Sequence, residues 1–176
     1  MHNFSELIDR CTSFTLYNLE VVQNEIFEAF KESGATIHIK NLQMINLQKT
    51  FFVVGVFSFY ESLLQDRLNC DNGFHGVRNI LEANSEDILL SKFKELNNII
   101  NTLKHGKGRS YQNLIENVNR HFDIKIKQPD EVFFEEGNVD EISALIEVND
   151  EFIIQVVEVI NEVTLTIKKH CSDVII

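Results

Sequence analysis

Breaks between regular segments are rare in this sequence, and their scarcity restricts the fold more than any other feature. The 176 residues include seven glycines and a single proline. An all-β sandwich or barrel needs turn residues about every 8–12 positions, and this chain does not supply them. Long helices are therefore expected, and the length of the chain suits a single helical domain over residues 1–176.

Hydrophobic periodicity predicts an all-α, mostly antiparallel bundle of four long helices plus short helical pieces. Apolar residues recur at helical spacing over residues 4–33, 41–68 and 149–170, and over a segment that opens at Asn84 or Ser85. Short pieces are expected at residues 77–83 and 111–120, and ATIHIK is expected to be a linker. Residues 122–148 are predicted to form an irregular connection, in which FDIKIK alternates as a short strand does and DEVFFEEG is either another strand or an extended packing segment.

The most apolar stretch is FFVVGVFSFY, residues 51–60, inside the second long helix. Because this stretch is apolar nearly all round, helix 41–68 is expected to be the most buried element, against which the others pack. A membrane-spanning helix needs about 20 consecutive apolar residues, so no association with a membrane is expected. Cys11 lies on the apolar stripe of the first helix and is predicted to belong to the core.

The cysteines and histidines indicate where in the cell the protein belongs and whether it can bind a metal ion. Three widely spaced cysteines without a C-x-x-C pair, and a start that lacks a signal peptide, indicate a cytoplasmic protein. The six histidines form no H-x-x-x-H pair, and His121 with Asp123 falls short of a metal ligand set. No metal and no cofactor are expected. The formal charge of −11 disfavours a general nucleic-acid-binding surface but leaves room for a local basic site.

The candidate binding residues lie on and beyond the third long helix. Asn98, Asn101 and His105 share one polar face, turned away from the leucine and isoleucine stripe. Asparagine is a mediocre helix former and a costly choice for a plain solvated face. Three alternatives stay open: this face is solvated, it binds a ligand, or it bonds to the side chains of helix 41–68.

Charged residues on and near that helix are further candidate binding residues. Lys104, Lys107 and Arg109 are explained as cations at a helix C-terminus, where they complement the helix dipole, and they are also candidate binding residues. Glu61 follows the apolar block of the second helix, where it either stays solvated or points inward to a partner.

Two segments, FSFYESLL at residues 57–64 and INTLKHGKG at residues 100–108, carry a resemblance to a known family. Together they resemble the HEPN superfamily, and in particular bacterial HEPN-like proteins whose helix carries a polar residue, three spacers, and then His and Gly. The resemblance covers about residues 42–111. It implies a bundle of four to five helices that is usually dimeric. Active members cleave RNA without a metal, using an arginine, a polar residue and a histidine.

Carried onto this chain, the polar residue is Asn101 and the histidine is His105, whereas Ile100 occupies the position of the arginine. The chain therefore lacks the cation that would neutralise the phosphate and the developing negative charge. We predict a non-catalytic interaction or regulatory module, which family association places in phage defence or a toxin–antitoxin pair. The alternative is a metal-independent endoribonuclease in which His105 acts with Asn101 and a cation, either Arg109, Lys104 or Lys107.

The predicted partners follow from the same resemblance. A second copy of the chain is expected, and the high aliphatic content of helix 149–170 also favours it. A further protein partner is the expectation for a regulatory module, and RNA is the partner that the endoribonuclease alternative requires.

Overall fold

The computed structural model describes residues 3–129, 131 and 145–171, which contain six helices and no strand. This confirms the all-α prediction. The four long predicted segments each correspond to one long helix, and two shorter helices lie between them. The helices are, in chain order, α1 (Phe4–Glu32), α2 (Thr36–Leu68), α3 (Gly73–Ala83), α4 (Asp87–His105), α5 (Arg109–Glu116) and α6 (Asp150–His170).

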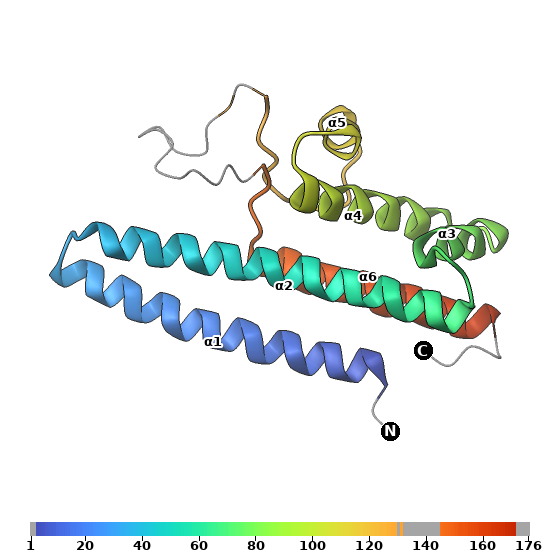
Figure 1. Cartoon of the computed structure of the whole chain (residues 1–176), viewed down its shortest axis with the longest axis horizontal. Coiled ribbons are helices and arrows are strands. Elements are labelled where there is room, and N and C mark those ends of the chain that lie inside the picture. The colour runs from blue at the N-terminus through green and yellow to red at the C-terminus, as the bar shows by residue number, and fades with distance from the viewer. Residues whose placement is uncertain (1–2, 130, 132–144, 172–176) are drawn as a thin grey trace.

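The helices are stacked in layers (Figure 1). The hairpin of α1 and α2 lies on one side, with α6 next to α2, and α3 and α4 cover the other side. The short helix α5 packs against α4 at the outer edge of that side. The helices α2 and α6 lie side by side, and both pack against α1 on one side and against α3 and α4 on the other.

The centre of the core is α6 rather than α2. Nine of the 21 residues of α6 are buried, against six of the 33 residues of α2. The prediction that helix 41–68 is the most buried element is therefore wrong. The physical reason is coverage: α1, α2, α3 and α4 all pack against α6, whereas α2 buries one stripe and leaves Phe51 and Phe59 59% and 64% exposed.

Two helices begin earlier than predicted. The segment ATIHIK was expected to be a linker, but α2 starts at Thr36 and the His38 ring packs on Phe30 of α1, with ring centroids 5.0 Å apart. The third helix starts at Gly73 instead of residue 77, because the Asn72 side chain accepts a hydrogen bond from the His75 backbone N–H at 2.8 Å. The turn signal at this point is thus also a helix N-cap.

Two further boundaries differ from the expectation. The fourth helix begins at Asp87 instead of Asn84 or Ser85, because Ser85 adopts a left-handed backbone with φ of 56°. Its C-terminus follows the prediction, since Gly106 stops it with a φ of 72°. The fifth helix ends at Glu116, whereas the pattern predicted helix as far as residue 120.

Only part of the connection before α6 is described. In FDIKIK, Phe122, Ile124 and Ile126 are buried and alternate with more exposed residues, as expected for an extended segment. Ile126 pairs with Ile146 in an isolated antiparallel bridge, so the two segments meet without forming a strand. The segment DEVFFEEG lies outside the described residues except for Glu131.

The first helix buries little of its surface. Only Ile8, Thr12 and Ile26 are buried in its 29 residues. Cys11, predicted to belong to the core, is exposed, because the side of α1 that carries it faces away from α6. Among the described residues, no helix combines the length and the apolarity needed to cross a lipid bilayer.

Two polar contacts fix α2 against α6. The Lys49 ammonium, buried in α2, lies 2.7 Å from the Asp150 carboxylate in the first turn of α6. The Tyr60 hydroxyl lies 3.0 Å from the Thr164 hydroxyl deep in the core. A buried polar group without a partner is costly, so these contacts fix the register of the two helices as well as their separation.

Burial raises the pKa of the Tyr60 hydroxyl well above its usual value of 10.0, although the Thr164 hydrogen bond opposes the shift. The free energy of unfolding should therefore decrease as the pH rises above about 10, because Tyr60 then ionises only in the unfolded chain. We expect Tyr60→Phe to cost about 1 kcal/mol near neutral pH and to weaken this alkaline decrease by up to about 1.4 kcal/mol per pH unit. Urea unfolding at neutral and alkaline pH measures both. An equal alkaline decrease in the two proteins would contradict the assignment.

The α2–α3 contact depends on Gly73. A Cβ atom at this position would lie 2.7 Å from the Glu61 carbonyl oxygen and 2.7 Å from the Leu64 Cβ. We expect Gly73→Ala to lower the free energy of unfolding by about 1–3 kcal/mol, because two helix backbones would have to separate. Gly76→Ala on the same helix is the matched control, since its Cβ would meet only the flexible ends of Leu68 and Cys70, at 3.1 and 3.5 Å. Equal effects of the two substitutions in urea unfolding would contradict this reading.

Candidate functional site

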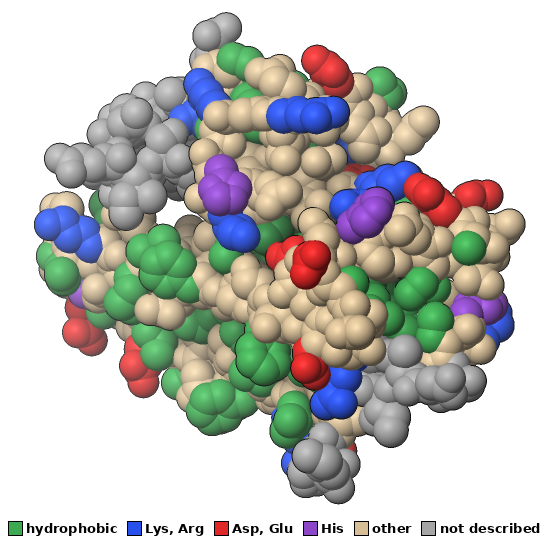
Figure 2. Space-filling view, turned by 45° about the vertical axis from the view of Figure 1, so that its right-hand side comes forward, with side chains coloured by type: hydrophobic (Ala, Val, Ile, Leu, Met, Phe, Trp, Pro, Cys, Tyr) green, Lys and Arg blue, Asp and Glu red, His purple; other side chains and the backbone are tan. Residues whose placement is uncertain are grey.

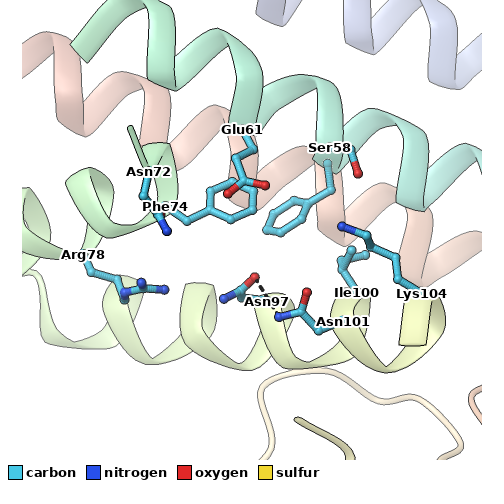
Figure 3. Close-up of a pocket in the computed structure, with 10 residues that line it drawn as sticks. Ser58, Glu61, Asn72, Phe74, Arg78, Asn97, Ile100, Asn101 and Lys104 are labelled. Atoms are coloured by element: carbon cyan, nitrogen blue, oxygen red, sulfur yellow. Dashed lines mark hydrogen bonds between the residues drawn. The ribbon is translucent and has the colours of Figure 1, made fainter. Parts of the chain in front are cut away.

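A polar pocket of about 160 Å³ lies between α2, α3 and α4. Figure 3 shows its walls: α2 on one side, α4 on the opposite side, and α3 with its N-cap closing one end. Seven of its ten lining residues are polar or charged. The lining residues are Phe57, Ser58, Glu61, Asn72, Phe74, Arg78, Asn97, Ile100, Asn101 and Lys104.

The α4 wall is a row of hydrogen-bonding groups. Asn97, Asn101 and Lys104 stand at positions i, i+4 and i+7, which share one face of a helix. The Asn101 side-chain N–H donates to the Asn97 side-chain oxygen at 3.5 Å, a long and weak bond. Arg78 of α3 extends the row beyond Asn97, so the row has a cation at each end (Figure 3).

The charged groups of the pocket have no hydrogen-bond or ion-pair partner among the residues that the structure describes. Glu61 and Arg78 are half-buried and Lys104 is exposed, and none of the three forms a hydrogen bond or ion pair within the described part of the chain. Glu61 points into the pocket from α2, across from Asn97 (Figure 3). The pocket therefore presents two cations and one carboxylate whose charges are not neutralised by nearby protein groups.

The floor of the pocket is apolar and rigid. The Phe57 and Phe74 rings pack with centroids 4.5 Å apart, and both contact Phe93 below them. Ile100 is 2% exposed and packs into this core. An isoleucine at this position therefore has a packing role, which accounts for the apolar residue found where the family resemblance leads one to look for an arginine.

The structure brings together three of the candidate residues and separates the other four. Glu61, Asn101 and Lys104 line the pocket. Asn98 is half-buried outside it, and its backbone carbonyl accepts a hydrogen bond from the Thr102 hydroxyl at 2.8 Å. The remaining three are exposed and lie outside the pocket, namely His105, Lys107 and Arg109.

Arg78 and Asn97 were missed by the sequence reasoning. Asn97 could have been found, because its spacing to Asn101 and Lys104 places all three on one face of a helix. Arg78 lies on a different helix, and no pattern in the sequence indicates that α3 turns it toward α4. Neither Asn98 nor Asn101 bonds to α2 within the described residues, and Asn101 instead faces the open pocket.

His121 has a structural role. Its ring nitrogen lies 2.9 Å from the Ser91 hydroxyl, and its backbone N–H donates to the buried Glu95 carboxylate at 2.9 Å. These bonds attach the segment after α5 to α4. Among the described residues, no group of three or more His, Cys, Asp or Glu side chains could hold a metal ion.

A second feature is a broad apolar surface on the α1–α2 hairpin, called here the α1–α2 face. Its large hydrophobic side chains are Leu7, Phe14, Tyr17, Val21 and Val22 of α1, with Ile37, Met44, Phe51 and Phe59 of α2. Figure 2 shows hydrophobic side chains gathered over the lower part of that view, where the hairpin lies. The two stripes meet where the Phe59 ring stacks on Phe4, with centroids 5.8 Å apart.

Comparison with protein-family models, with curated proteins and with solved structures finds no match for this chain. The resemblance to the HEPN superfamily therefore stays a prediction.

Proposed function

We propose that this chain is a non-catalytic interaction module with a HEPN-like bundle, and that two copies associate through the α1–α2 face. The observation that carries the proposal is the exposure of large side chains there, such as Phe14 at 70% and Tyr17 at 64%. Contiguous apolar surface of this size on a folded protein marks an interaction site.

The middle of the α1–α2 face is nearly free of charge, whereas Arg10 and Lys40 lie near its ends. Between residues 11 and 24 of α1 the only charged residue is Glu20, and between residues 41 and 60 of α2 it is Lys49. Lys49 is buried against Asp150 and does not reach the surface. In a chain of net charge −11, two copies repel each other unless they meet on an uncharged surface, and loss of charged residues is typical of interface cores.

The available area suits a stable dimer. At about 200 Å² for each aromatic side chain, the exposed parts of Phe14, Tyr17, Phe51 and Phe59 amount to about 500 Å². The aliphatic side chains of the face raise this toward the 800 Å² or so per partner of a standard interface. The hairpin is also long enough, since the 29 residues of α1 extend about 43 Å.

The spacing on α1 favours a second copy as the occupant. Leu7, Phe14 and Val21 recur every seven residues, with Cys11 and Asn18 between them, so the exposed stripe has the heptad pattern of a coiled-coil seam. A single asparagine in such a seam specifies register and oligomeric state. A two-fold symmetric contact needs one self-complementary patch on each copy, and this stripe meets that need.

The reason for expecting a dimer differs from the one drawn from the sequence. Most aliphatic residues of α6 are buried within the chain, with Ile154 and Leu165 as the exposed exceptions. They are therefore used in the core, and the surface left for a partner belongs to α1 and α2.

Phe14→Glu should dissociate the dimer, because a symmetric contact would bury two unpaired carboxylates. We expect a cost of about 3 kcal/mol or more, which is over a hundredfold in Kd. Light scattering should give twice the chain mass of 20.4 kDa for the wild type and the single mass for the variant. Val118→Glu is the control, because Val118 is 93% exposed and lies outside the α1–α2 face. A monomeric wild type at micromolar concentration, or equal dissociation by both variants, would overturn the proposal.

An RNA cleavage assay distinguishes the endoribonuclease alternative from the non-catalytic proposal. The exposed position of His105 outside the pocket supports the non-catalytic proposal, since a general acid or base must reach the reacting atoms. We expect structured and single-stranded RNA to stay intact at several pH values. RNA cleavage that His105→Ala abolishes would establish the alternative instead.

A further inference from the structure

We infer that the pocket between α2, α3 and α4 binds a small phosphate ester that carries hydroxyl groups, such as a sugar phosphate. The inference rests on the side chains of the pocket and not on the α1–α2 face. Its starting point is the set of half-buried and exposed charges that point into one cavity without protein partners, namely Arg78, Lys104 and Glu61.

The local charge favours an anion. The chain as a whole carries −11, yet two of the three charged groups of the pocket are cations. With Glu61 included, the charges of the pocket sum to +1. A phosphate monoester carries about −1.5 to −2 at neutral pH, so one cation can bind the phosphate directly while the other, at the opposite end of the row, adds to the favourable potential. The planar guanidinium of Arg78 also offers a pair of N–H donors that match two phosphate oxygens.

The opposite wall favours hydroxyl groups. The Glu61 carboxylate accepts hydrogen bonds and repels a bare anion, so a ligand must present donors on that side. Asn97 and Asn101 both donate and accept, and their mutual bond of 3.5 Å is easily exchanged for bonds to a ligand. Because Glu61 has no cation partner within the described residues, its binding to a hydroxyl breaks no ion pair.

The size of the pocket selects a compact ligand. Its volume of about 160 Å³ equals that of about five water molecules, and drug-sized ligands need about 300 Å³ or more. A phosphate with a short polyol or pentose fits these limits, whereas the base of a mononucleotide would remain outside. Phe57 and Phe74 close the bottom of the pocket but are almost fully buried, so the polar side chains of the walls make most of the contacts with such a ligand.

Isothermal titration calorimetry with ribose 5-phosphate tests the inference, with ribose and inorganic phosphate as matched ligands. We expect ribose 5-phosphate to bind more tightly than phosphate, and ribose to give no measurable heat. Arg78→Gln should weaken binding by about tenfold or more, because a charge-assisted bond is lost, and Lys104→Gln should weaken it less. Arg67→Gln is the control, since Arg67 is exposed near the end of α2, pairs with Asp66 and lies outside the pocket.

Glu61→Gln tests the role of the carboxylate. It should leave phosphate binding intact or improve it, and it should reduce the preference for ribose 5-phosphate over phosphate. The exposed Lys104 forms no hydrogen bond or ion pair with the described residues, so Lys104→Gln should fold normally. This variant therefore remains informative if Arg78→Gln fails to fold.

The inference is overturned if neither phosphate compound binds at millimolar concentration, or if Lys104→Gln and Arg78→Gln bind like the wild type. It is also overturned if adenosine 5′-monophosphate or an RNA oligonucleotide binds more tightly than ribose 5-phosphate. Phe14→Glu should bind ribose 5-phosphate normally, so failure of this site and failure of the proposed self-association are measured separately.

Discussion

The rest of the structure depends on the burial of α6. All of its valine and isoleucine side chains except Ile154 are buried, and α1, α2, α3 and α4 pack around it. Each buried aliphatic side chain contributes about 1.5–3 kcal/mol relative to an exposed one. Because α6 supplies so many of the buried side chains of the core, α2 buries only one stripe of its own side chains. The opposite surface of α2 is left with Phe51 and Phe59 exposed, and none of the other described helices packs on this apolar surface of the α1–α2 hairpin.

The same packing creates the pocket. Close approach of Gly73 to the α2 backbone brings α3 against α2, so Arg78 faces Asn97 of α4 and Glu61 of α2 around one cavity. The aromatic contacts of Phe57, Phe74 and Phe93 below it hold the three helices at fixed separations. A site built on packed helices is held more firmly than one on loops. By contrast, His105 is the last residue of α4, Lys107 lies in the turn after it, and Arg109 is the first residue of α5. An exposed apolar surface and a polar pocket are therefore present on one α-helical framework.

Much of the fold was predictable because it depends on local periodicity. Apolar residues at helical spacing identified the four long segments, Gly106 identified the end of α4, and Asn149 identified the start of α6, where its side chain accepts the Phe152 backbone N–H at 2.8 Å. The candidate site was predictable only in part. Composition and position identified Asn101, Lys104 and Glu61. However, helical periodicity on α4 allows two overlapping polar faces, one with Asn97 and one with Asn98. The sequence favoured the face with Asn98, whereas Asn97 lines the pocket.

The sequence by itself determined the helical class, the approximate extent of the long helices and the polar character of α4, because these properties depend on neighbours within a few residues along the chain. The tertiary structure alone decided which apolar faces are covered. Cys11 and Phe51 are as apolar as core residues, and they are exposed because no other helix of the chain packs on their side of the hairpin. It also decided that Arg78 and Asn97 line the same pocket, since the proximity of residues far apart along the chain follows from the packing of whole helices and leaves no local pattern.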